Sequence, residues 1–172
     1  MTASSSNLSN IPASIRGIVF DVDGILTDGR IIYTDDGHEL KQFHVQDGAS
    51  LKLLMQHDIQ IGIITGRRSP IVARRARELG IQFLKQGASS KADALNELIN
   101  DGFIGQDLAA VGDDIQDLAM FQHPAVTFSI TVPNAHPTVL AQADAVTERR
   151  GGDGVVVEIS QALLRAQSRW PY

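Results

Sequence analysis

The 172-residue chain contains no cysteine, which excludes disulfide bonds, zinc–thiolate sites and cysteine nucleophiles. It has no apolar stretch approaching the roughly 20 residues that cross a bilayer and no block of basic residues of the kind that binds nucleic acid. Its formal net charge is −5, and its first residues lack the apolar core of a secretory signal. We therefore expect a cytoplasmic protein that has neither nucleic acid nor membrane as a partner.

The chain does have enough apolar sequence for one domain with its own core. Hydrophobic residues make up 43% of it, a share that suits a single globular unit. Residues 1–14 are rich in Ser and Asn and are expected to be a disordered leader. Residues 15–172 are then expected to form one domain, which ends in a helix and tail over 151–172.

Short apolar runs alternate with helix-like segments along this domain. The runs predict strands at 15–20, 59–64, 81–84, 108–111, 125–130 and 144–147, with helices at 48–57, 69–79, 90–101, 115–122, 136–143 and 153–168. The alternation is typical of an α/β fold, a doubly wound, Rossmann-like parallel sheet of about six strands with helices on both faces. Residues 29–45 interrupt it, and their two apolar runs around an Asp-Asp-Gly turn predict a projecting β-hairpin.

The first apolar run, IRGIVF, is followed directly by Asp21 and Asp23. Asp and Gly are common in turns, so an ordinary turn is one explanation. The other is a metal-assisted phosphoryl-transfer site. Residues two apart in a strand point to the same side, so the two carboxylates are expected to face a common site, where one attacks phosphorus and the other handles a proton.

Three further strand ends carry side chains suited to the same chemistry. They are Thr65, Gly66 and Arg67 after the second strand, Lys91 at the start of a helix, and Asp113, Asp114 and Asp117 in GDDIQD. Each alone has an ordinary explanation as a turn, a surface lysine or a helix cap. Together they fall at one edge of one sheet, where doubly wound folds bind ligands. Grouped carboxylates favour Mg²⁺, and the threonine, the glycine amide and the lysine could hold phosphate oxygens.

The motifs FDVDG, TGR, Lys91 and GDDIQD, in this order, resemble the four motifs of the haloacid dehalogenase superfamily of phosphatases. Longer stretches, including ITGRRSPIVARRARELGI and NAHPTVLAQADAVTERRGGDG, resemble the branch that acts on 3-deoxy-D-manno-octulosonate 8-phosphate, from about Ile15 to Gln167. The resemblance implies a Mg²⁺-dependent phosphatase that works through an aspartyl-phosphate intermediate and serves lipopolysaccharide biosynthesis.

The resemblance also implies the roles of individual residues. Asp21 is the expected nucleophile and Asp23 the general acid/base; the metal ligands are Asp21, the backbone carbonyl of Asp23, and Asp113. The phosphate-binding residues are Thr65, Gly66 and Lys91. The expected contacts to the sugar acid are Arg67, Arg75 and, from the predicted turn over 44–48, His44, Gln46, Asp47 and Gly48.

Two departures from the family pattern remove positive charge near the expected substrate. Gln46 stands where the family usually has arginine, and Val157 replaces the arginine of a GAxRE-like run. A phosphatase for a nine-carbon, sialic-acid-type 9-phosphate therefore stays open as an alternative. So does a catalytically silent oligomerisation or regulatory relative, although the intact set of acids argues against silence.

The spacing of the motifs leaves no room for a cap domain. Only the hairpin and one helix–strand unit separate Asp23 from Thr65, and one such unit and a loop separate Thr65 from Lys91. A small substrate still needs water controlled around its reaction. We therefore expect neighbouring subunits to cover the site through the hairpin and the C-terminal tail, in a homotetramer of the kind that the resemblance implies.

Overall fold

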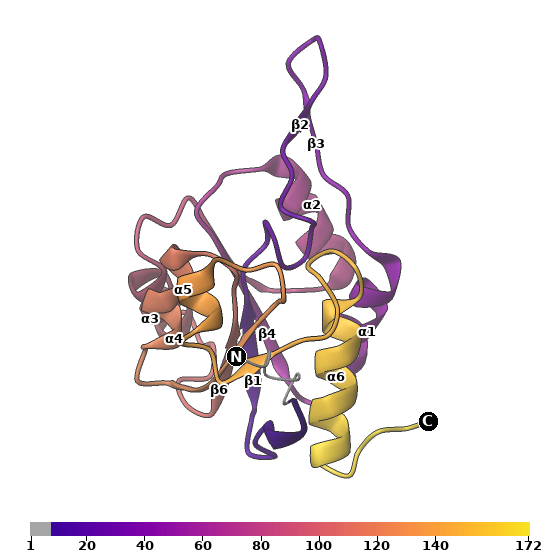
Figure 1. The fold of residues 1–172 in the computed structure, drawn as a ribbon, viewed down its shortest axis with the longest axis vertical. Helices are drawn as coiled ribbons and strands as arrows, with labels where there is room; N and C mark the ends of the chain where they lie inside the picture. The colour runs from indigo at the N-terminus through magenta and orange to yellow at the C-terminus, as the bar shows by residue number, and fades with distance from the viewer. Residues whose placement is uncertain (1–7) are drawn as a thin grey trace.

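The computed structural model describes residues 8–172, and a six-stranded parallel sheet lies at its centre (Figure 1). The strand order is β5-β4-β1-β6-β7-β8. The strands are β1 (Gly17–Phe20), β4 (Gln60–Thr65), β5 (Phe83–Gln86), β6 (Leu108–Val111), β7 (Val126–Thr131) and β8 (Ala145–Val146). Every neighbouring pair is parallel, which confirms the predicted α/β class and its doubly wound sheet.

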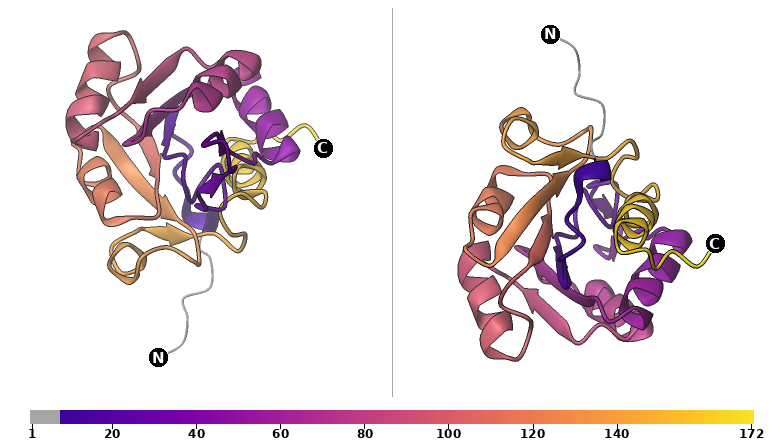
Figure 2. Two further views of the ribbon diagram at one scale, coloured as in Figure 1. Left: turned by 90° about the horizontal axis from the view of Figure 1, so that it is seen from above. Right: turned by 90° about the horizontal axis from the view of Figure 1, so that it is seen from below.

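Helices cover both faces of this sheet (Figure 2). They are α1 (Val45–Gln56), α2 (Pro70–Leu79), α3 (Lys91–Asn100), α4 (Leu118–Phe121), α5 (Pro137–Leu140) and α6 (Val155–Ala166), with 3₁₀ turns η1 (Leu8–Asn10) and η2 (Ile115–Asp117). One apolar cluster lies under α1, α2 and α6, and a second lies under α3 and α4. Within residues 8–172, no helix is both long enough and apolar enough to cross a membrane.

The order of the strands determines where a ligand can bind. Phe20 at the end of β1 is level with Ile63 of β4 on one side and with Val111 of β6 on the other. The chain runs outward from β1 through β4 to β5, then crosses back to β6 and continues in the opposite direction. The carboxyl ends of β1 and β6 therefore flank the switch point, the place where doubly wound sheets bind ligands.

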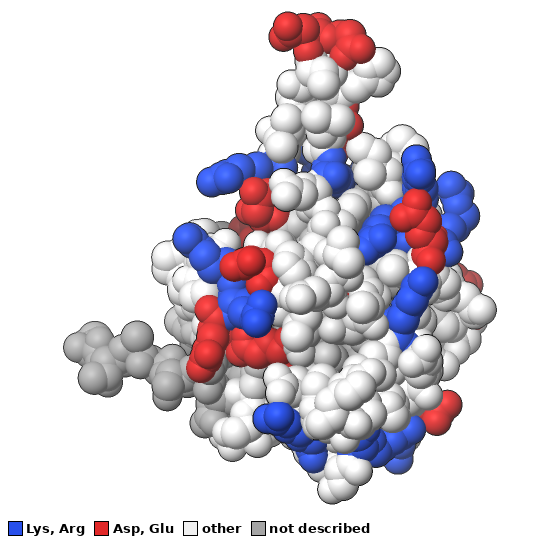
Figure 3. Space-filling model, turned by 90° about the vertical axis from the view of Figure 1, so that its right-hand side faces the viewer, with Lys and Arg blue, Asp and Glu red and all other residues white. Residues whose placement is uncertain are grey.

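The predicted hairpin is present as the antiparallel pair β2 (Ile32–Tyr33) and β3 (Glu39–Leu40). It stands away from the rest of the domain, beyond the carboxyl ends of the sheet strands (Figure 1). Acidic side chains lie at its tip, most of the stem below carries no charge, and basic side chains lie around its base (Figure 3). Glu39 of β3 is the acid on the stem itself. The exposed apolar side chains on or beside the stem are Ile31, Ile32, Tyr33, Leu40 and Val45.

The prediction of a disordered leader over residues 1–14 is wrong from residue 8 onward. Leu8 and Ile11 are buried in the same cluster as the apolar face of α6. The amide of Ile11 donates to the carbonyl of Leu8 (3.1 Å), which closes the η1 turn. Two apolar residues in a polar stretch were enough to attach it to the core. Residues 1–7 lie outside the described part of the chain.

Two predicted boundaries also differ from the structure. The sequence predicts a strand over 81–84. In the structure, Gly80, in a left-handed conformation (φ 80°), ends α2, and the amide of Ile81 donates to the carbonyl of Ala76. Ile81 therefore belongs to the helix terminus, and β5 begins two residues later. The expected turn over 44–48 is instead the residue before α1 and the first turn of that helix.

Asp47 connects this first turn to the far end of the chain. Its Oδ1 accepts hydrogen bonds from the amides of Val156 (2.8 Å) and Val157 (3.2 Å), in the first turn of α6. Amides in the first turn of a helix have no partner within the helix, and the N-cap of α6 is Gly154, which has no side chain to offer. A carboxylate from α1 therefore caps α6.

We expect Asp47→Ala to lower the free energy of unfolding by about 1–3 kcal/mol, because it leaves buried amides without an acceptor. Asp47→Asn keeps an acceptor oxygen and should lose less. Urea unfolding can be followed through the single tryptophan, Trp170, which packs against the core cluster. Equal stability of Asp47→Ala and the wild type would show that the cap contributes nothing.

Candidate active site

The chain turns as soon as it leaves β1. The amide of Asp21 still donates to the carbonyl of Val111 in β6 (2.9 Å). A few residues later the amide of Leu26 bonds back to the carbonyl of Val22 (2.9 Å). The segment after Asp21 is therefore a tight turn, and the two-residue alternation of a strand does not apply to it.

This turn sends the two aspartates in different directions. Asp21 contacts Lys91 at the start of α3, whereas Asp23 contacts Lys41, which directly follows β3. The expectation that both side chains face the same side because they are two residues apart in a strand is thus wrong. The two carboxylates border the same loop, but each has its own cation.

Lys91 is the cation at the centre of the site. Its Nζ donates to Oδ1 of Asp21 (2.5 Å) and also to Oδ1 of Asp117. All three residues are buried, with 5% of Lys91 and none of Asp117 exposed. A cation at a helix N-terminus opposes the helix dipole. Here the two carboxylates compensate for that opposition.

Asp117 also shapes the loop that follows β6. Its Oδ2 accepts hydrogen bonds from the amides of Asp113 and Asp114 (both 2.9 Å), and Asp114 caps the η2 turn in return. Both carboxylate oxygens of Asp117 are therefore in use. The sequence predicts Asp117 only as one of the grouped carboxylates and not as the partner of Lys91; its position four residues after Asp113 in GDDIQD is the signal for its role.

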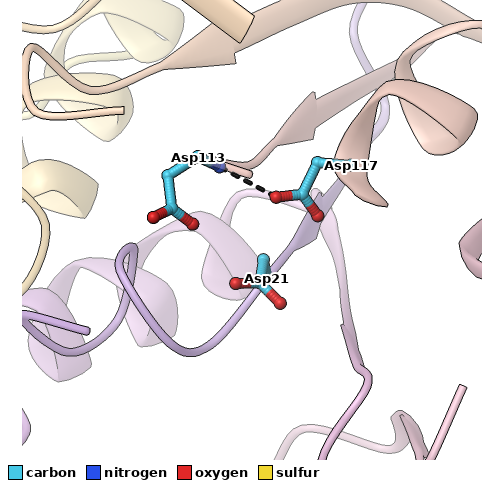
Figure 4. A group of neighbouring side chains, drawn as sticks. All are labelled: Asp21, Asp113 and Asp117. Carbon is cyan, nitrogen blue, oxygen red and sulfur yellow. Dashed lines mark hydrogen bonds between the residues drawn. The ribbon is translucent and has the colours of Figure 1, made fainter. Parts of the chain in front are cut away.

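Asp113 brings a third carboxylate to the same place (Figure 4). Asp21, Asp113 and Asp117 each offer an oxygen within 4.8 Å of the others. Oδ1 of Asp113 is buried without a hydrogen-bond partner in residues 8–172. Its other oxygen lies against Gly24, where an added Cβ would come within 2.0 Å of it. The glycine of DVDG, at φ 100°, is therefore required for this approach.

The proximity of these acids changes their proton affinity. Burial, opposed by the charge of Lys91, raises the pKa of Asp21 to about 7. Burial together with the neighbouring carboxylates of Asp117 and Asp114 raises the pKa of Asp113 to about 7. Burial lowers the pKa of Lys91, but its two carboxylate partners outweigh this effect and raise it overall. The site therefore has an excess of negative charge that a cation would relieve.

A divalent cation fits this donor set. The oxygen ligands and the buried, unpaired oxygen of Asp113 suit Mg²⁺, which binds through one or two carboxylates and completes its shell with water and phosphate. Asp21 and Asp113 are the carboxylates with an oxygen to offer, since Asp117 uses both of its own. Asp23 is predicted to bind the metal only through its backbone carbonyl, and its carboxylate pairs with Lys41.

The expected phosphate-binding residues lie at the same sheet edge. Thr65 ends β4, beside β1, and is buried; its Oγ1 accepts a hydrogen bond from the amide of Arg67 (3.3 Å). Gly66 follows and its backbone is exposed. An added Cβ there would meet Gln116 at 3.4 Å. Together with Lys91, these groups give the edge a hydroxyl, an open amide and an ammonium.

Asp23 belongs to a separate ring of four charges. Lys41 bonds to Oδ1 of Asp23 and lies 3.1 Å from Oε1 of Glu39. The other oxygen of Glu39 accepts from Nη2 of Arg67 (2.6 Å). Nε of Arg67 lies 3.9 Å from Oδ2 of Asp23 and closes the ring. No sequence motif points to Lys41 or Glu39, because their hairpin strand is separated from both aspartate motifs along the chain.

The remaining candidates for sugar contacts lie between α1 and α2. His44, Asp47, Gly48 and Arg75 line one cavity of about 10 Å³, which has room for a single water. Arg75 lies across Gly48, where an added Cβ would come within 2.3 Å of its Nη2, and stacks over Phe43 at 5.8 Å.

His44 and Asp47 place polar atoms in the interior, whereas the neighbouring Gln46 is exposed to solvent. Nδ1 of His44 is buried and has no hydrogen-bond partner among residues 8–172. Asp47 faces α6, whereas Gln46 is exposed at the start of α1. The structure therefore brings His44, Asp47, Gly48 and Arg75 together but not into the acidic cluster.

The glycine-rich segment before α6 supports the loop after β1. The amide of Gly152 donates to the carbonyl of Ile25 (2.9 Å), and an added Cβ at Gly151 would lie 1.7 Å from the carbonyl oxygen of Gly24. Only glycine permits this contact. This glycine-rich segment therefore packs on its own domain in this structure.

Comparison with known proteins agrees with this geometry. A family model described as haloacid dehalogenase-like hydrolase matches residues 81–159. The chain is 40% identical over 157 residues to 3-deoxy-D-manno-octulosonate 8-phosphate phosphatase KdsC of Escherichia coli strain K12, covering 91% of this chain and 82% of that protein. The chain belongs to this phosphatase family, within the haloacid dehalogenase-like hydrolases.

Solved structures of the family have the same fold. The 3-deoxy-D-manno-octulosonate 8-phosphate phosphatase of Moraxella catarrhalis, crystallised with magnesium, phosphate and KDO, is 41% identical with a TM-score of 0.86 over 94% of this chain and 92% of that one. A protein of Vibrio cholerae described as a putative phosphatase of this kind is 33% identical with a TM-score of 0.90, over 99% of both chains.

The raised pKa values of Asp21 and Asp113 predict that Mg²⁺ binding depends on pH. Both carboxyls hold protons below about pH 7, and Mg²⁺ must displace them, whereas above it they are ionised. We expect the apparent affinity to fall at least ~10-fold between about pH 8 and about pH 5.5. Calorimetric titration in two buffers also counts the protons released. Equal affinity at both pH values, with no proton release, would contradict the expectation.

Proposed function

We propose that the protein is a Mg²⁺-dependent phosphatase that hydrolyses 3-deoxy-D-manno-octulosonate 8-phosphate to the free sugar acid and phosphate, in lipopolysaccharide biosynthesis. The observation that carries the proposal is the convergence of Asp21, Lys91 and Asp113 at the switch point of the sheet. These groups fit phosphoryl transfer, and the chain shares 40% identity with phosphatases named for this substrate. A nine-carbon 9-phosphate and a silent relative are not favoured.

In the first half of the proposed reaction Asp21 is the nucleophile. A carboxylate oxygen of Asp21 attacks phosphorus, and the bond from phosphorus to the 8-oxygen of the sugar breaks. Asp23 gives a proton to this leaving oxygen, so that the sugar departs as an alcohol. The products of this half are the free sugar acid and an aspartyl phosphate on Asp21.

In the second half water hydrolyses the aspartyl phosphate. Asp23, now a carboxylate, takes a proton from the water as its oxygen bonds to phosphorus. The bond between phosphorus and Asp21 breaks, which restores the nucleophile and releases inorganic phosphate. Asp23 thus ends each cycle protonated, ready to act as an acid again.

The other residues hold the reacting groups in place. Mg²⁺, bound by Asp21, Asp113 and the backbone carbonyl of Asp23, supplies positive charge to the phosphoryl oxygens. Lys91, the hydroxyl of Thr65 and the amide of Gly66 hold these oxygens by hydrogen bonds that strengthen as charge develops. Asp117 keeps the Lys91 ammonium and the Asp113 loop in position.

The assignment of the sugar contacts is also part of the proposal. Arg67, near the mouth of the site, and Arg75 suit the carboxylate of a sugar acid. His44, with a buried unpaired nitrogen, suits a hydroxyl. Gln46 and Val157 leave fewer cations at this end than the family usually has, but neither touches the acidic cluster.

Replacement of the nucleophile tests the chemistry. We expect Asp21→Asn to abolish turnover, because an amide cannot form the aspartyl phosphate, while the fold remains intact. Phosphate release from 3-deoxy-D-manno-octulosonate 8-phosphate with Mg²⁺ measures this. Asp28→Asn, an exposed aspartate on the same loop, is the matched control. Appreciable turnover by Asp21→Asn would exclude Asp21 as the nucleophile.

The proposal includes a homotetramer assembled through the hairpin. A two-stranded hairpin is at best marginally stable alone, and this one exposes Ile32, Tyr33 and Leu40 together with free strand edges. Association would cover these groups and place a neighbour above a site that has no cap. The helix α6 is part of the core, so only the last residues, such as the exposed Tyr172, are free to reach that neighbour. The cytoplasmic location stays a prediction.

A charge placed on the hairpin tests the assembly. We expect Ile32→Glu to reduce the tetramer to smaller species, because it would bury a carboxylate in an apolar contact. Ile115→Glu replaces an isoleucine of similar exposure (52% against 44%) outside the hairpin and should leave the assembly unchanged. Sedimentation velocity measures the mass of each variant. Ile32→Glu with the mass of the wild type would rule out the hairpin as the interface.

A further inference from the structure

The ring of charges around Asp23 includes a lysine that the proposed reaction does not use. Only 2% of the Lys41 side chain is exposed, against 20% for its partner Asp23. A buried ammonium strongly destabilises a protein unless anions surround it. Lys41 meets this requirement with two carboxylates, those of Asp23 and Glu39.

The arrangement of the ring is more specific than a tether for the hairpin would need. Lys41 bonds to Oδ1 of Asp23, while Arg67 lies near Oδ2 on the other side. Glu39 joins the two cations, 3.1 Å from Lys41 and 2.6 Å from Arg67. Asp23 is thus hydrogen-bonded by Lys41 at Oδ1, while Arg67 lies 3.9 Å from Oδ2 without a hydrogen bond, and the cation nearer to Asp23 is the buried one.

The contact also explains why Asp23 does not join the acidic cluster. Asp21, Asp113 and Asp117 converge within 4.8 Å, but the Asp23 carboxylate lies apart from them. Because the turn after β1 leaves the side chain of Asp23 partly exposed, its direction must come from its partners. Of these partners, Lys41 makes the shorter contact.

We infer that Lys41 is a positioning residue of the phosphatase, whose ammonium holds the Asp23 carboxyl group in the orientation from which it gives a proton to the leaving sugar oxygen. This inference rests on the proposed function, in which Asp23 is the general acid. The ion pairs of Lys41 are with Asp23 and Glu39 and not with the nucleophile Asp21, so its loss should misdirect the proton without removing the nucleophile.

The test compares leaving groups that differ in their need for a proton. An alkoxide such as the sugar oxygen departs poorly unless it is protonated, whereas p-nitrophenolate departs without help. The constant kcat/KM includes only the steps up to departure of the alcohol, so it isolates the acid role of Asp23 from its later role as a base. A lysine with a purely structural role would affect both substrates equally.

The variants are Lys41→Met, Lys41→Arg and, as a matched control, Lys52→Met at an exposed position of α1. For Lys41→Met we expect kcat/KM on 3-deoxy-D-manno-octulosonate 8-phosphate to fall ~10²-fold, the lower end of the usual general acid contribution, with less than a roughly threefold change on p-nitrophenyl phosphate. Lys41→Arg should recover at least ~10-fold of the loss. Lys52→Met should match the wild type on both substrates.

Equal losses on the two substrates, or no loss on either, would overturn the inference and leave the proposed function standing. An inactive wild type on every alkyl phosphate would instead overturn the proposed function, and the inference with it. If circular dichroism shows that Lys41→Met does not fold, Lys41→Gln replaces it in the same measurements. Glutamine retains a hydrogen-bond donor at the buried position. The same two outcomes then decide.

Discussion

The buried contact of Lys91 with two aspartates is the constraint on which the site depends. Lys91 begins α3, Asp21 follows β1 and Asp117 follows β6, so one ammonium joins three segments that are far apart in sequence. Two carboxylates around one buried cation leave net negative charge, and Asp113 adds to it. An arrangement of this kind contributes little to stability by itself. The arrangement is explained instead by the divalent cation and the phosphate that its charges are suited to bind.

The sheet order makes this contact possible. Strands β1 and β6 are neighbours in the sheet, although residues 21–107 separate them in sequence. The loops that follow the two strands therefore lie at the same edge of the sheet. Glycines then allow the loops to touch. A side chain at Gly24 would clash with the carboxylate of Asp113, and a side chain at Gly151 would clash with the carbonyl of Gly24. The segment before α6 thus supports the catalytic loop from behind. The C-terminal part of the chain therefore packs directly against the loop that carries Asp21 and Asp23.

Sequence reasoning reached those features that depend on local pattern. The alternation of apolar runs and helices predicted the parallel sheet, and the position of the acids at strand ends predicted Asp21, Lys91 and Asp113 at one edge. It failed where geometry depends on distant contacts. The direction of Asp23 is determined by Lys41 on the hairpin, and Asp47 is turned toward α6 by amides more than a hundred positions away. Residues 8–11 are attached to the core by Leu8 and Ile11. Their apolar partners lie elsewhere in the chain, so the local polar sequence does not reveal the contact.

The hairpin bears on both the proposed chemistry and the proposed assembly of a domain that has no cap. Its exposed strand residues Ile32, Tyr33 and Leu40 are apolar. By contrast, Glu39, the first residue of β3, and Lys41, the residue directly after β3, make ion pairs with Arg67 and Asp23. A subunit that packs on the outer residues would also restrain the inner ones, because both lie on the same short strands. Restraint of the general acid would then follow from association itself. A hairpin with these two faces can replace a cap in both of its tasks, which are to cover the substrate and to fix the group that protonates it.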